Sequence, residues 1–132
     1  MYRVTLNSTR EAWHQIQIQD PEAGKVKLRV RYALLDTDTM AEWIAEGLSD
    51  DADGDESDSR MAALRRSLDP ERRAEMDRRL ADRIVDWDLG GDDGEKLPCT
   101  TDNKLAVLKI PYLREPIDRG LFDASRGAAR KN

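Results

Sequence analysis

Side chains suited to catalysis are few in this sequence of 132 residues, and none has the neighbours that catalysis requires. His14 is the one histidine, so no histidine pair is possible. No serine or cysteine lies at a recognisable catalytic spacing from it. Cys99 is the one cysteine, which excludes an intramolecular disulfide and a multi-cysteine metal site. No basic cluster adjoins Cys99 in the sequence to lower the pKa of its thiol. We therefore expect no enzyme activity, no cofactor and no metal, and we interpret both residues as structural.

The acidic run of residues 50–58 suggests a calcium loop, so its spacing needs testing. An EF-hand loop requires oxygen ligands at positions 1, 3 and 5, glycine at position 6 and glutamate at position 12. Placing Gly54 at position 6 puts Arg60 at position 12, where the decisive ligand is required. Because like charges at this density repel one another, we predict that residues 50–58 form an acidic flexible linker.

The glycines that follow Trp87 do not form a phosphate-binding loop. Gly90, Gly91 and Gly94 are not followed by the required Lys-Ser or Lys-Thr pair, and no strong strand precedes them. This stretch is therefore interpreted as an ordered turn between two helices.

Two basic segments are candidates for binding an acidic partner or nucleic acid. Lysines and arginines alternate with apolar residues along residues 25–31, and five arginines lie within residues 70–88. The helix arginines are interleaved with acids, for example Glu75 four residues before Arg79, which favours a solvated face of mixed charge. The basic strand face can equally be solvated and discourage edge-to-edge aggregation. Since the chain outside 50–58 is nearly neutral, a nucleic-acid-binding regulator is the alternative rather than the preferred function.

The elements that position these residues begin with strands. Apolar residues alternate with polar ones in residues 1–9, 13–19 and 26–32, which is the spacing of half-buried strands. Pro21 and Gly24 supply a turn between the last two of these runs. We predict an antiparallel hairpin, or a three-stranded sheet, within a β part of residues 1–35.

The apolar spacing then changes to that of helices. Residues 36–49 form the first predicted helix, with a capping box from Thr39 to Glu42 and with Trp43 lying against the hairpin. A helical part follows in residues 59–128, and residues 129–132 form a frayed tail.

Helix signals divide the helical part. Asp69 and Pro70 start a helix that runs to about residue 88 and carries Leu80, Ile84 and Trp87 on one side. Thr100 or Thr101 caps the next helix, Ile110 and Pro111 end it, and Pro116 restarts or kinks the last one. The fold class is therefore α+β: one domain of residues 1–132, in which a small N-terminal β part packs on four to five helices. The longest apolar runs are only a few residues, so we expect neither a membrane span nor a signal peptide and place the protein in the cytoplasm.

The layout as a whole resembles a known family. The matching segments are KVKLRVRYALLDTD followed by MAEWIAEGL, then IVDWDL, a Gly/Asp turn, LPCTTDNKLAVLKIPYLREPI and the ending GAARKN. Together they cover residues 25–132 and resemble the tail assembly chaperones of long-tailed (siphovirus-type) bacteriophages or prophages. The turn after Trp87 is longer than is usual in that family, and Pro116 interrupts the last helix.

The resemblance implies a function and partners. Chaperones of this family are not enzymes; they hold the tape measure protein soluble in the host cytoplasm and are not expected in the mature virion. Lys131 and Asn132 can be encoded by an A-rich slippery sequence, and in the family a frameshift there appends an extension that recruits the tail tube protein. Self-association is a further expectation, whereas membrane and nucleic-acid partners are not expected.

Two sets of residues are candidates for roles in partner binding. The apolar stripes of the helices exceed what a small hairpin can cover, so a partner helix can bind some of them unless the stripes cover one another. The predicted partner-binding residues are Trp43, Leu64, Leu80, Ile84, Leu105 and Leu108. The predicted structural pivot, which sets the angle between the Arg-rich helix and the C-terminal helices, comprises Trp87, Pro98, Thr100 and Asn103.

Overall fold

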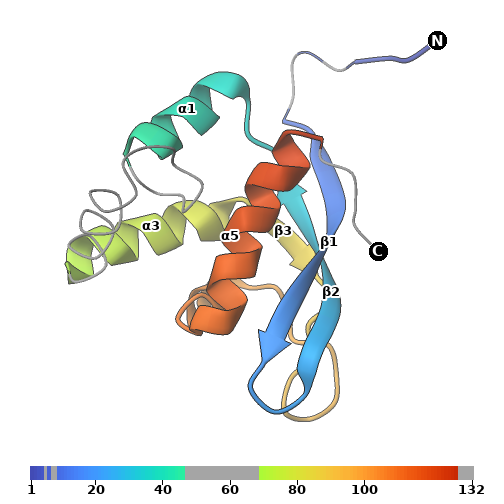
Figure 1. Ribbon diagram of the computed structural model, residues 1–132, viewed down its shortest axis with the longest axis vertical. Helices are drawn as coiled ribbons and strands as arrows, with labels where there is room; N and C mark the ends of the chain where they lie inside the picture. Colours follow the sequence, from blue (N-terminus) through green and yellow to red (C-terminus); the bar gives the residue numbers. More distant parts are fainter. Residues whose placement is uncertain (5, 7–8, 47–68, 128–132) are drawn as a thin grey trace.

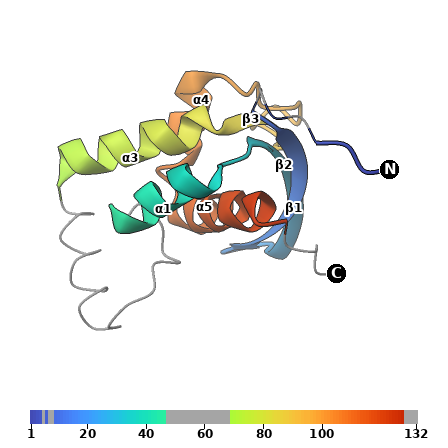
Figure 2. The same ribbon diagram turned by 90° about the horizontal axis from the view of Figure 1, so that it is seen from above.

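The structure, a computed structural model, describes residues 1–4, 6, 9–46 and 69–127. Its elements are β1 (Glu11–Asp20), β2 (Gly24–Ala33), α1 (Thr37–Ala45), α3 (Pro70–Asp82), β3 (Ile84–Trp87), α4 (Thr101–Val107) and α5 (Pro111–Ser125). The strands form one antiparallel sheet in the order β1-β2-β3 (Figure 1). The described helices lie on one side of this sheet, and none lies on the other (Figure 2). The α+β class predicted from the sequence is confirmed.

The hairpin of β1 and β2 forms as its alternation predicts. The two strands pair without interruption from Glu11 and Ala33 to Asp20 and Gly24. The Asp20 carboxylate closes the turn by accepting hydrogen bonds from the backbone N–H groups of Glu22 and Ala23, both at 2.8 Å. Gly24 has a φ of 77°, which a residue with a Cβ adopts only at a cost. Turn chemistry and strand pattern therefore specify the same hairpin.

The third strand is not the one that the sequence predicts. Among the described residues before β1 there is no strand, and Tyr2, Val4 and Leu6 are 74%, 63% and 87% exposed. The third position in the sheet is taken by β3, which comes from the other half of the chain and pairs with the far side of β2. An alternating pattern makes a strand possible, but only a partner strand makes it form.

The same strand corrects the predicted helix of residues 70–88. Helix α3 ends at Asp82, and β3 follows it directly. In the pairing with β2, Arg31 lies opposite Asp86 but Tyr32 lies opposite Ile84, so Val85 is an extra residue in a bulge. The bulge allows Ile84 and Trp87 to be buried together although they are three residues apart.

Two of the predicted helix starts are confirmed. Asp69 caps α3 before Pro70, and Thr100 caps α4 by accepting from the Asn103 N–H. Helix α1, in contrast, is capped by Asp36, which accepts from the Thr39 N–H at 2.7 Å, so the predicted capping box from Thr39 to Glu42 lies too late.

The last helix also differs from its prediction. Pro111 begins α5, and Pro116 lies inside it without breaking it. The predicted linker of residues 50–58, the helix predicted after Ser59 and the predicted tail of residues 129–132 lie outside the described residues.

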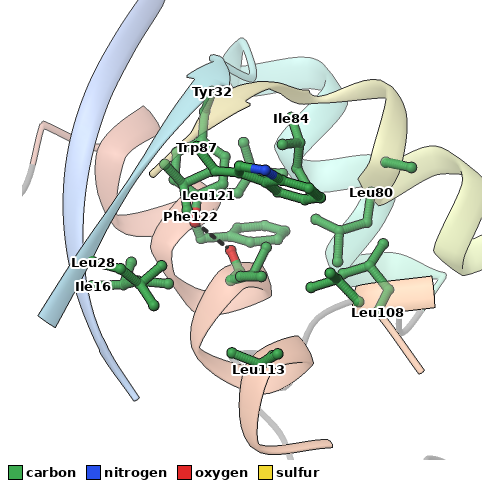
Figure 3. Close-up of a cluster of buried hydrophobic side chains, with 14 of the residues drawn as sticks. Ile16, Leu28, Tyr32, Leu80, Ile84, Trp87, Leu108, Leu113, Leu121 and Phe122 are labelled. Carbon is green, nitrogen blue, oxygen red and sulfur yellow. Dashed lines mark hydrogen bonds between the residues drawn. The ribbon is translucent and has the colours of Figure 1, made fainter. Parts of the chain in front are cut away.

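The core lies between the sheet and the helices. Tyr32, Trp87 and Phe122 stand at its centre in Figure 3 and are each 0% exposed. Trp43 meets the edge of the Phe122 ring, with 6.2 Å between the ring centroids, so α1 packs on α5 within the same core that holds the buried hairpin residues. The Tyr32 hydroxyl donates to the Ile117 carbonyl at 2.7 Å, and burial raises the pKa of Tyr32 well above its usual value. This contact ties the central strand to α5.

Candidate partner-binding surfaces

Most of the residues predicted to contact a partner lie in the core. Trp43, Leu80, Ile84 and Leu108 are 6%, 2%, 1% and 1% exposed, so in this conformation they pack within the chain. The helix stripes therefore cover one another at these four positions, which was the other possibility raised by the sequence. Leu105 is half-buried on α4, and Leu64 lies outside the described residues.

The four predicted pivot residues form a connected unit. The buried Trp87 indole N–H donates to the Leu97 carbonyl at 2.7 Å. The Pro98 carbonyl accepts from the Asn103 side-chain amide at 2.8 Å and from the Thr100 N–H at 2.9 Å. These bonds fasten the loop before α4 to the end of β3. The unit thus fixes the position of α4 relative to β3, and its predicted effect on the angle between the Arg-rich helix and the C-terminal helices stays a prediction.

The arginines of α3 are engaged by carboxylates and carbonyls of the chain. Arg79 bonds to Glu46 at the end of α1 and to Glu75 at 2.8 Å. Arg72 donates to the Glu46 carbonyl at 3.2 Å. These contacts hold α3 against α1, which confirms the interpretation of a mixed-charge helix and leaves these two guanidinium groups occupied.

A more deeply placed ion pair joins α3 to α5. Arg114 Nε lies 3.0 Å from Asp77 Oδ1, and the two side chains are only 21% and 11% exposed. Partly buried pairs of this kind are costly to break, because removing one partner leaves the other charge without compensation. The α3 charges therefore have a structural use.

The basic side chains of β2 lie on the outer face of the sheet. Arg29 stacks over the Trp13 ring at 5.3 Å and lies 3.8 Å from Asp88, while Arg31 pairs with Glu11 at 3.1 Å. Lys25 and Lys27 are exposed and form no ion pair with any residue that the structure describes. Because β2 is the central strand, these cations lie on a face of the sheet. They therefore do not protect a sheet edge from aggregation, which is the role that one interpretation of the sequence gave them.

Trp13 is a surface feature that the sequence prediction missed. It is 43% exposed on the outer face of β1, on the same side as Gln15, Gln17 and Gln19. The exposure of Trp13 could have been predicted from the sequence. Side chains of a strand alternate between its two faces, so Trp13 lies on the face opposite that of Ile16 and Ile18, which are buried.

The two residues with catalytic potential, Cys99 and His14, are both half-buried. Burial raises the pKa of the half-buried Cys99 thiol, which disfavours the thiolate form. His14 is half-buried and has an interaction partner within the chain. Within residues 1–4, 6, 9–46 and 69–127, no group of three or more His, Cys, Asp or Glu side chains is placed to hold a metal ion.

Comparison with known proteins identifies no relative: no protein-family model, curated protein or solved structure matches this chain. Across the described part of the chain, no helix has the length and apolar character needed to cross a membrane.

Proposed function

We propose that this chain is a non-enzymatic tail assembly chaperone of a long-tailed phage or prophage, which binds the tape measure protein and keeps it soluble in the host cytoplasm. The proposal is carried by the order of Trp87, a Gly/Asp turn, Pro98, Thr100 and Asn103, which resembles the family pattern. The hydrogen bonds made by these residues hold α4 in place. This explains physically why these residue types follow one another in this order.

Leu105 is the described residue of the predicted set that a partner can reach without opening the core. Its neighbours Val107 and Leu108 are 5% and 1% exposed, whereas Leu105 is half-buried and packs against the edge of the core. A partner helix that covers an apolar side chain of this kind gains hydrophobic stabilisation. We assign Leu105 to the contact with the tape measure protein.

Co-expression tests this proposal. The tape measure protein encoded beside this chain should be insoluble alone and soluble in a complex with it. Leu105→Gln should lower the soluble fraction, whereas Ala106→Gln, at the exposed neighbouring position on α4, should not. A tape measure protein that is no more soluble with the wild-type chain than without it would contradict the chaperone function.

The gene sequence tests the proposed extended form. A slippery A-rich sequence at the codons of Lys131 and Asn132, followed by an overlapping frame, would support an extension that recruits the tail tube protein. Non-slippery codons without such a frame would remove that part of the proposal and leave the contact with the tape measure protein untouched.

Nucleic-acid binding by the outer face of the sheet is the second candidate function. It is favoured by Lys25 and Lys27, which are exposed, and by the Trp13 ring, on which a base can stack. Titration with single-stranded oligonucleotides at low salt tests it, and Lys25→Gln with Lys27→Gln should weaken any binding and its salt dependence. Absence of binding at low salt would exclude this candidate.

A further inference from the structure

Strand β1 forms one edge of the sheet over its full length of ten residues. Two hydrogen bonds show which way its backbone points. The Leu34 N–H donates to the Arg10 carbonyl at 2.8 Å, and the Asp88 N–H donates to the Arg29 carbonyl at 3.1 Å. Successive residues of a strand direct their backbone groups to opposite sides. Even-numbered residues of β1 therefore bond to β2, and odd-numbered ones such as Trp13 and Gln17 point their N–H and C=O groups to the outer edge, where no other described strand pairs with β1.

This edge lacks the features that normally prevent a further strand from pairing. Natural edge strands are protected by lysines, prolines, bulges or short length. Residues 12–19 contain no Asp, Glu, Lys, Arg, Pro or Gly. The pairing of β1 with β2 runs without a bulge, and the cations of the sheet stand on β2 instead. The backbone of β1 is thus long, regular and uncharged where it faces outward.

A second copy of β1 is the strand that fits this edge. An antiparallel pairing about a two-fold axis at Ile16 places Gln15 opposite Gln17 and Ala12 opposite Asp20 of the second copy, so no like charges lie directly opposite one another. Gln15, Gln17 and Gln19 then lie across from outer-face residues of the partner strand, where amides can exchange hydrogen bonds. On the inner face, Ile16 and Ile18 continue the apolar surface.

Exposed apolar residues are concentrated at the N-terminal end of β1 and in the chain before it. The exposed large hydrophobic residues of the described chain all fall within residues 1–13. They are Met1, Tyr2, Val4, Leu6 and Trp13. Apolar surface that can be covered favours association, so the N-terminal end of β1 is where a second copy gains most.

We infer that two copies of this chain pair through the outer edges of β1 and form one continuous six-stranded sheet. The inference depends on the backbone geometry of β1 and not on the chaperone function, so each can fail without the other. The dimer leaves α4 and Leu105 untouched, because the helices lie on one face of the sheet and the pairing occurs at its edge (Figure 2).

Gln17→Pro tests the inference, because the backbone N–H of Gln17 points to the outer edge of β1. Proline removes the outward N–H of residue 17 and leaves the hydrogen bonds between β1 and β2 intact. Sedimentation analysis over a wide range of protein concentrations should show a dimer for the wild type. Each dimer carries the change twice, so the dissociation constant should rise about 100-fold or more. Gln17→Thr keeps the N–H and suits a strand, and this control should dimerise like the wild type.

Gln17→Lys keeps the inference testable if the proline variant fails to fold. It places like charges across the two-fold axis, so the dimer should weaken, and added salt should restore part of the affinity. A wild-type chain that remains monomeric at all concentrations would overturn the inference. So would a dimer that persists in folded Gln17→Pro and Gln17→Lys, or one lost only when residues 1–6 are removed.

Discussion

The two edges of the sheet are built in opposite ways. The β3 edge is four residues long and bulged at Val85, and the loop after it turns back at once through a bridge between Gly90 and Lys96. Lys96 also pairs with Asp86 of β3 at 2.8 Å, so this edge carries charge. The β1 edge is ten residues long, regular, and free of Asp, Glu, Lys and Arg in residues 12–19.

The difference between the two edges indicates which of them can accept a further strand. A short, bulged and charged edge offers little backbone to another strand, whereas a long and regular one is a template for pairing. At the β3 edge, the side chains serve the fold of this chain, and Trp87 is fully buried there. At the β1 edge, Trp13 stays 43% exposed.

The largest expected effect separates Trp87 from Trp13. Trp87→Ala should lower the free energy of unfolding by about 3–5 kcal/mol, because it empties the centre of the core and removes the bond to the Leu97 carbonyl. Trp13→Ala should cost about 1 kcal/mol or less, since it loses a surface contact with Arg29. Chemical denaturation of both variants measures the two values. Similar losses would show that the β1 side depends on Trp13 as the β3 side depends on Trp87.

The next effect separates two glycines. A Cβ at Gly120 of α5 would lie 2.5 Å from the Tyr32 hydroxyl oxygen and 2.6 Å from Ile16 Cγ2. Both are side-chain atoms of the hairpin that point toward α5. Gly120→Ala should therefore destabilise the fold by about 1–3 kcal/mol through overpacking. Gly90→Ala, beyond β3, meets nothing closer than 3.8 Å and should change stability little. Denaturation midpoints compare the two, and an unchanged midpoint for Gly120→Ala would mean that α5 can move away from the sheet.

The β1 side could be predicted from the sequence because its signals are local. The alternation of residues 26–32 and the turn at Gly24 specify the hairpin within one stretch of chain. Helix starts are local as well, and Asp69 and Thr100 cap helices as expected. Residues 1–9 show the limit, because the same alternation forms no strand among the described residues there.

The β3 side could not be predicted, because its pairing is not local. Ile84 and Trp87 are three residues apart, which is a helical spacing, and only the bulge opposite β2 makes it compatible with a strand. The burial of four predicted partner-binding residues could not be foreseen for a related reason. Whether Leu80 and Leu108 are exposed depends on how the helices and the sheet assemble, and periodicity shows which residues share a face but not what covers that face.

A smaller effect tests the unit that fastens α4 to the β3 side. The Thr100 hydroxyl accepts from the Asn103 N–H at 3.2 Å, so Thr100→Ala should cost about 1 kcal/mol through loss of the helix cap. Thr101→Ala, at the first exposed residue of α4, should be nearly neutral. Thermal or chemical denaturation measures both. A greater loss of unfolding free energy for Thr101→Ala than for Thr100→Ala would mean that Thr101 caps the helix. The start of α4 would then lie one residue further from Pro98.

The smallest expected effect is a pH dependence of the β3 edge. The hydrogen bond from Lys96 and the Trp87 N–H hold the pKa of Asp86 below its ordinary value. A carboxyl group whose pKa is lowered by folding adds stability above its unfolded pKa, about 3.9, and that stability is lost as the pH falls through the lower folded value. Asp86→Asn should therefore bring the unfolding free energies at pH 6 and pH 3 closer together. Lys96→Met should do the same, since it removes the first cause of the shift. If both variants retain the wild-type difference between the two pH values, the charged pair does not stabilise this edge, and its short length and bulge alone distinguish it from β1.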